Sequence, residues 1–473
     1  MTNYPALITL VTYSAILVAI GFSFARRATS EDSFLVGERK LGPLIIGLAY
    51  AASSSSAWVL LGFSGFVYSV GLSALWMVPG ILAGYAAVWL WAGRILQSES
   101  HKLGLVTFSD FLTIGCSPGA SRLIRIIASL MIAFCFSYYV ASQFQGAGKA
   151  FDDLFSTGMV AGVLLGATII LVYVLLGGFL AISVVDTLQG VLIGCVAIAL
   201  PVLAFFEAGG FSGIGQILVT APAPYSDTFG NRTGWIAGGF ALGMTATGFG
   251  ALGQPHLVTW IMAARDTRSR VVGAGVAIGW AAIVYGGMAV LGLCARALLD
   301  PQTAPESIFF LLTAELLPGM LSGIVAAAIL SAIMSTVDSQ LLVAGAAISH
   351  DMGIARKFRG QDILLTRLSI LAVCAAAVII TLTLPSTIFE RTLFAWTALG
   401  ASFGPTLVAR ILRYRSSGAA ILYSMLIGFS LSVAYEWIWP AGPGSVWARI
   451  VPWVGAFLPH YLSRVFKGKG TPL

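Results

Sequence analysis

The sequence is poor in charge. Charged residues make up 10% of its 473 residues and hydrophobic residues 58%, whereas a soluble domain carries about a quarter charged residues. Cysteine is also scarce: five residues are scattered along the chain, odd in number and without a CxxC pair. That pattern predicts neither a disulfide framework nor a cysteine metal site. The composition therefore predicts an integral membrane protein.

Signals for catalysis are missing as well. The four histidines lie in no ligand spacing, which disfavours a transition-metal site; they are His101, His256, His350 and His460. We find no nucleophile–base pair, so the sequence does not predict an enzyme. The longest polar stretch, residues 207–233, is a loop too short for a catalytic domain.

Apolar segments of helical length are abundant and predict an all-α membrane protein with thirteen transmembrane helices. They are centred near residues 15, 57, 82, 135, 168, 193, 248, 283, 333, 375, 400, 427 and 453. Basic residues gather in cytoplasmic loops, and with the N-terminus outside, 21 of the 26 fall in predicted inside segments. We therefore expect a multi-pass protein of the plasma membrane, the inner membrane of a bacterium, with a cytoplasmic C-terminus. This topology accounts for the net charge of +7 without nucleic-acid binding.

Two predicted spans are interrupted. The second contains AYAASSSSAW (49–58), and the seventh contains GMTATGFGALGQPH (243–256). Backbone groups released at membrane depth must find partners in protein, water or a bound ion. The breaks lie five spans apart, which predicts two five-helix repeats of inverted topology. The predicted divisions are 1–43 (first helix and loop), 44–206 and 207–415 (the repeats), and 416–473 (two added helices and a short tail).

The ninth predicted span carries a third polar cluster, SAIMSTVDSQLL (331–342). Asp338 lies in this cluster, and the sixth span contributes Asp186. Hydroxyl, carbonyl and carboxylate oxygens suit a small hard cation, and a mostly neutral set favours a monovalent ion. Helix packing is the alternative for the serines, and an interface role is the alternative for Asp186. One helix face collects four residues of the cluster: Ala332, Ser335, Thr336 and Ser339.

Several linked motifs resemble the sodium:solute symporter family: VGERKLGP, TFSDFL, LLGGFLAISVVDTLQG, GQPHLVTWIMAA, ILSAIMSTVDSQLLV and FAWTALGASFGP. The similarity runs from Tyr13 to Val408 and is closest to the proline transporters of the family. It implies a leucine-transporter-like fold with an inverted five-plus-five helix repeat, and sodium as the coupling ion. We expect a monomer that binds sodium, a small organic solute and membrane lipid, and no nucleic acid.

The resemblance also implies the binding residues. The sodium ligands would be the carbonyls of Ala52, Ser55 and Ala332 with the hydroxyls of Ser335 and Thr336. A second sodium ion, held by some relatives, would lie at Asp186, Asp338 and Ser339. The solute pocket would contain Ser54, Ser56, Trp58, Tyr139, Gln143, Thr247, Ala251 and Pro255.

The pocket departs from that of the proline transporters. They carry aspartate at Ser54, tryptophan and tyrosine at Thr247 and Ala251, and glycine at Gln143. Losing two aromatic rings enlarges the pocket, and Gln143 adds an amide that donates and accepts. The expected function is sodium-coupled secondary active import of a small organic solute, with proline or a related amino acid as the leading candidate. Sialic acid, a monocarboxylate or pantothenate as the solute, a passive channel, and a sensor remain alternatives.

Overall fold

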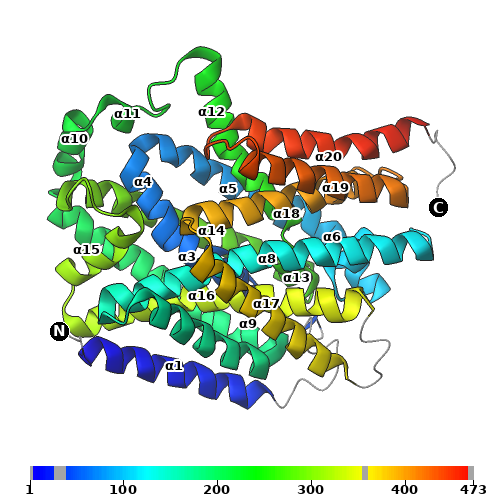
Figure 1. The fold of residues 1–473 in the computed structure, drawn as a ribbon, viewed down its shortest axis with the longest axis horizontal. Helices are drawn as coiled ribbons and strands as arrows, with labels where there is room; N and C mark the ends of the chain where they lie inside the picture. Colours follow the sequence, from blue (N-terminus) through cyan, green and yellow to red (C-terminus); the bar gives the residue numbers. More distant parts are fainter. Residues whose placement is uncertain (1–3, 26–38, 354–360, 467–473) are drawn as a thin grey trace.

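The fold consists of long helices, many of them running side by side in a bundle (Figure 1). The computed structural model describes residues 4–25, 39–353 and 361–466, and no β-strand occurs within these ranges. Part of the basic pattern used for the topology lies outside the described residues: Arg26, Arg27, Arg356, Lys357, Arg359, Lys467 and Lys469.

The first half of the chain begins with α1 (Tyr4–Ala25) and ends with α9 (Met159–Glu207). Between them lie α3 (Pro43–Ala57), η2 (Trp58–Phe63), α4 (Ser64–Val70), η3 (Gly71–Trp76), α5 (Met77–Ala86), η4 (Ala87–Ala92), α6 (Gly93–Leu103), α7 (Phe108–Leu112) and α8 (Pro118–Phe155). The predicted fifth and sixth spans both belong to α9, a single helical element of 49 residues.

The second half begins with two short helices, α10 (Gly210–Thr220) and α11 (Ala223–Ser226). They are followed by α12 (Gly234–Ala246), η5 (Thr247–Gly253), α13 (Pro255–Met262), α14 (Thr267–Leu298), η6 (Pro305–Ser307), α15 (Ile308–Leu316), α16 (Gly319–Ala346), η7 (Ala347–Asp351), α17 (Asp362–Thr383), α18 (Ile388–Ile411), α19 (Gly418–Trp437) and α20 (Val446–Phe466). The last two helices lie against each other at one side of the bundle (Figure 1).

Nine helical segments in the described ranges are long and apolar enough to cross a membrane. One of them, Pro43–Leu103, has 61 residues, which is enough for two crossings of about 20 residues each. Figure 1 shows that α1 begins and α20 ends at opposite ends of the bundle, as an odd number of crossings requires. The all-helical membrane fold is confirmed, and the count of thirteen stays a prediction.

Both predicted interruptions are confirmed. In the second span, Ser56 leaves the helical conformation (φ 53°, ψ 171°) and the π-helix η2 follows directly. In the seventh span, α12 passes into the 3-10 helix η5, and Gln254 is extended (φ −87°, ψ 107°) before Pro255 opens α13. The backbone thus departs from the α-helix where serine, glycine and proline are concentrated, as their chemistry predicts.

Glycines allow the second break to lie directly against α5. A Cβ atom added to Gly248 of η5 would lie 1.8 Å from the carbonyl oxygen of Gly80. One added to Gly80 would lie 2.0 Å from the carbonyl oxygen of Thr245. Because both obstacles are backbone atoms, no side-chain rotation can make room for a larger residue.

Gly248→Ala should therefore destabilise the fold, since overpacking costs about 1–3 kcal/mol. We expect a lower thermal unfolding midpoint and a lower yield of monodisperse protein in detergent. Gly279→Ala on α14 is the matched control, because a Cβ atom there has no neighbour within 4 Å and alanine is the better helix former. Equal losses in the two variants would contradict this account of the contact.

Candidate ion and solute sites

Side chains from two other helices pair with the backbone groups that the break in α3 releases. In an unbroken helix, the Ala57 N–H would bond to the Ser53 carbonyl. Instead, that N–H donates to Gln143 Oε1 of α8 at 2.8 Å. The Ser53 carbonyl accepts a hydrogen bond from Thr336 Oγ1 of α16 at 3.0 Å. The two groups released at the break are therefore paired within the protein.

The predicted first sodium site lies where α3 meets α16. Its five residues, Ala52, Ser55, Ala332, Ser335 and Thr336, are all buried. Thr336 Oγ1 also lies 2.9 Å from the Ala332 carbonyl oxygen, so its single proton is shared between carbonyl oxygens of both helices. A hydroxyl that turns its proton away can offer the same oxygen to a cation, and carbonyls need no rearrangement to do so.

Ser53 was not among the predicted ligands, but its hydroxyl links α3 to both α16 and α13. Its hydroxyl bonds to the Ser335 carbonyl at 2.8 Å and to Ser339 Oγ at 2.6 Å. The indole N–H of Trp260, on α13, donates to the same hydroxyl at 3.2 Å. The helix after the second break is thus linked to the oxygen cluster at the first.

The predicted second sodium site contains two fully buried carboxylates, Asp186 on α9 and Asp338 on α16. They are close enough to interact electrostatically. Both oxygens of Asp186 and Oδ2 of Asp338 lack a hydrogen-bond partner among the described residues. Burying such groups unpaired is costly, so this pair is suited to hold a cation or to share a proton. Ser339, the third predicted ligand, bonds through its backbone N–H to Asp338 Oδ1.

Gln189 belongs to the same neighbourhood and was missed by sequence reasoning. It lies three residues after Asp186 on α9, is fully buried, and neither atom of its amide has a hydrogen-bond partner in the described part of the chain. Its spacing from Asp186 places the two side chains on one helix face. The three-residue spacing of these two polar side chains is the feature of the sequence that could have identified Gln189.

A narrow buried cavity lies between the two breaks. Two of its polar groups, Thr247 Oγ1 and Trp58 Nε1, are buried and have no hydrogen-bond partner within the described ranges. Such groups are suited to orient a polar solute in an otherwise apolar pocket. The lining includes four of the eight predicted solute residues, Ser54, Trp58, Tyr139 and Thr247, together with Ile81, Tyr285, Thr392, Leu393 and Trp396.

The other four predicted solute residues do not line this cavity. The Ser56 hydroxyl accepts the Trp58 N–H at 3.1 Å. The Gln143 amide is occupied, since it accepts from Ala57 and donates to Ser142 Oγ at 3.0 Å. Ala251 is buried within η5. Pro255 borders a different cavity.

An aromatic stack separates the solute cavity from a broad vestibule, to which Phe66, Phe389 and Leu393 contribute. The ring of Phe389 stacks on Trp58, with centroids 5.4 Å apart, and on Phe66, with centroids 4.6 Å apart. Leu393 borders both the vestibule and the cavity. Trp58 borders the cavity and Phe389 borders the vestibule, so their stacked rings lie between the two spaces at this point.

Broken membrane helices around buried oxygen clusters and an enclosed cavity are features of ion-coupled transporters. The model of the sodium:solute symporter family matches residues 34–428, and the chain belongs to that family. It is 28% identical to the osmoregulated proline transporter OpuE of Bacillus subtilis, with 89% of this chain and 87% of that protein covered. It is 29% identical to the sodium/proline symporter of Escherichia coli, with 90% and 86% covered.

The solved structure of a Na+-coupled sialic acid symporter in its outward-open state superposes with a TM-score of 0.83. The two chains are 15% identical, and 99% of each is covered. At this identity the likeness shows the fold alone. It confirms the leucine-transporter-like architecture expected from the sequence motifs.

Thr336→Ala should raise the sodium concentration needed for half-maximal sodium-dependent solute uptake. Removing an oxygen from a charged partner costs about 1.5–3 kcal/mol, or about tenfold or more in affinity. Ser331→Ala is the control: it also removes a hydroxyl of α16, one bonded to Tyr13, outside the predicted ligand set. Unfolding midpoints without sodium should separate ion binding from stability. An unchanged sodium requirement in Thr336→Ala would remove this residue from the site.

Proposed function

We propose that the chain is a sodium-coupled secondary active symporter that imports proline or a closely related amino acid. The observation that carries the proposal is the position of two adjacent residues at the first break. Ser53 joins the oxygen cluster on α16, and Ser54 lines the solute cavity. A conformational change at this break must move both sites together, which is the physical requirement for coupling.

Sodium would act by fixing the broken segment of α3. A cation held by carbonyls and hydroxyls of α3 and α16 draws the two helices together and sets the positions of Ser54 and Trp58. The solute then meets these two residues already in position, so it binds more tightly when sodium is present. By reciprocity, bound solute strengthens sodium binding to the same degree.

The cavity has a free volume of about 20 Å³ in this structure, which is room for about one water molecule. Solute binding therefore requires its walls to move apart, and the chemistry of those walls suits a small solute with one apolar surface. Tyr139, Tyr285 and Trp396 supply aromatic walls, although the two aromatic residues that the proline transporters carry at Thr247 and Ala251 are absent here. The indole N–H of Trp396 donates to the Thr247 carbonyl at 2.8 Å, so this ring lies directly behind Thr247. Such walls favour the pyrrolidine ring of proline over a bulky, highly hydroxylated sugar acid.

In the proposed topology the N-terminus is outside and the vestibule faces the exterior. Solute enters from the vestibule, and the stack of Phe66, Phe389 and Trp58 closes behind it. Opening toward the cytoplasm then requires α13 to move from its contacts at the second break. Both sites are built from one chain, so we propose that the monomer is the working unit.

The test of the proposed function is accumulation. Purified full-length protein in liposomes should concentrate labelled proline against its gradient when sodium is high outside, and should stop when the sodium gradient is collapsed by an ionophore. Competition with unlabelled amino acids, sialic acid, pantothenate and monocarboxylates then ranks the solutes. Equilibration without accumulation would indicate a channel, and sodium-driven accumulation of another solute would overturn proline.

We also propose a second sodium ion at Asp186, Asp338 and Ser339. The wild type should then show a sodium dependence of uptake with a Hill coefficient above one, and Asp338→Asn should lower it to about one, because a neutral amide ligates a cation more weakly. Asp300→Asn, at an exposed carboxylate, serves as control. A wild-type coefficient of one with a fully active Asp338→Asn variant would refute the second ion.

A further inference from the structure

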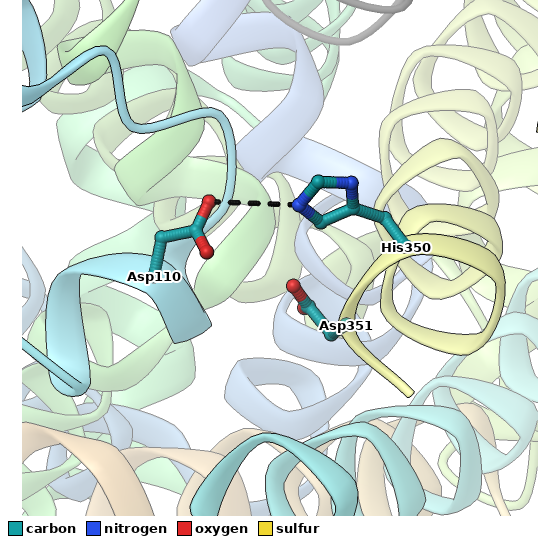
Figure 2. A group of neighbouring side chains, drawn as sticks. All are labelled: Asp110, His350 and Asp351. Carbon is teal, nitrogen blue, oxygen red and sulfur yellow. Dashed lines mark ion pairs between the residues drawn. The ribbon is translucent and has the colours of Figure 1, made fainter. Parts of the chain in front are cut away.

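A separate polar cluster lies at the end of α16, distant in sequence from the break at Ser56. Figure 2 shows Asp110 of α7 and the adjacent His350 and Asp351 of η7 pointing toward one another. One ligand-type atom from each residue can be chosen so that all three lie within 4.8 Å of one another. His350 Nε2 lies 3.8 Å from Asp110 Oδ2.

The donor set has the chemistry of a transition-metal site. One imidazole nitrogen and two carboxylate oxygens are ligands that Zn²⁺ accepts. Asp110 and Asp351 are buried, whereas the side chain of His350 is 22% exposed, so an ion can reach the cluster past the imidazole. Small side-chain rotations would bring the three ligand atoms to bonding distance from a common centre.

Ser109 provides an independent indication that a ligand belongs here. Its hydroxyl is buried, lines the same cavity as Asp351 and is directed toward the Asp351 carboxylate, but no hydrogen bond of normal length joins it to a described residue. A buried hydroxyl without a partner is unusual in a folded protein. A metal-bound water in this cavity would give the hydroxyl a partner.

The carboxylates are already held by surrounding groups, as metal ligands commonly are. Arg125 Nη2 lies 3.0 Å from Asp110 Oδ1, on the oxygen that does not face His350. The Thr107 hydroxyl donates to Asp351 Oδ1 at 2.9 Å. Asp110 Oδ2 also accepts the backbone N–H groups of Val106 and Thr107 at 3.3 Å. With the His350 imidazole neutral, as a metal ligand must be, two buried carboxylates beside one guanidinium leave an excess negative charge, which a divalent cation would offset.

We propose that Asp110, His350 and Asp351 form a binding site for a divalent transition-metal ion of the Zn²⁺ class, and that the bound ion clamps α7 to the end of α16. The lining of the adjoining cavity includes Thr107 and Asp351 together with Pro255 and Thr259 of α13. Because α13 follows the second break, a clamp at this end hinders the movement that opens the cavity. Metal binding therefore inhibits transport.

Binding is tested on the purified full-length protein without a polyhistidine tag. Calorimetry with Zn²⁺ alone should show one ion per wild-type chain, and Co²⁺ should produce a visible absorption band of a nitrogen- and oxygen-ligated ion. His350→Ala and Asp351→Asn should weaken Zn²⁺ binding by about tenfold or more. His101→Ala, at an exposed histidine on α6, should leave it unchanged.

His350→Gln, which keeps the side-chain volume, guards against misfolding of the alanine variant and should bind Zn²⁺ equally weakly. Sodium-driven uptake by the wild type should fall on adding Zn²⁺ and recover with EDTA, whereas His350→Gln should be insensitive. Absence of binding in the wild type, or equal losses in His101→Ala and His350→Ala, would overturn the site. Tight binding without inhibition would overturn the clamp. The binding measurements do not depend on the proposed solute, so their failure is distinct from a failure of proline transport.

Discussion

A broken helix inside a membrane must pair the backbone groups that it releases, and this constraint organises the protein. At the first break, Gln143 Oε1 accepts a hydrogen bond from the freed Ala57 N–H, and the Thr336 hydroxyl donates one to the freed Ser53 carbonyl. Bulk water is not available at that depth, so α8 and α16 must both lie against α3. The helix contacts that satisfy the break therefore also bring the hydroxyl face of α16 to the carbonyls of α3.

The second break obeys the same constraint with different partners. The Thr247 carbonyl accepts the indole N–H of Trp396, and the Gln254 amide donates to the carbonyls of Gly250 and Trp396. All these links run within η5 and its end or to α18, which also places Thr392 and Leu393 on the cavity. The single helix α18 therefore pairs with the backbone at the second break and lines the solute cavity. Through Phe389 it also contributes to the aromatic stack between the cavity and the vestibule.

Sequence reasoning succeeded where the controlling physics is local. Clustered serine, glycine and proline mark a backbone that leaves the helix, and the period of 3.6 residues collects the hydroxyls of α16 on one face. Sequence reasoning could not predict contacts between distant segments, such as the hydrogen bond from the Ala57 N–H of α3 to Gln143 of α8. Likewise, histidine spacing along the chain gives no sign that His350 meets Asp110, because packing of the bundle makes that contact. The fifth and sixth predicted spans belong to one continuous helix, α9. The lengths of the apolar segments do not show whether the backbone between them stays helical.

Both ends of the Gln143 side-chain amide are hydrogen-bonded within the protein, and this affects how solute preference can change among related transporters. The glycine that the proline transporters carry at this position has no side chain to accept from Ala57, so an exchange of Gln143 requires another partner for that N–H. Thr247, Ile81 and Thr392 border the cavity, and no side-chain hydrogen bond to a backbone break is described for them. Directed evolution toward a new solute should accumulate its first substitutions at these wall positions and leave Gln143 untouched.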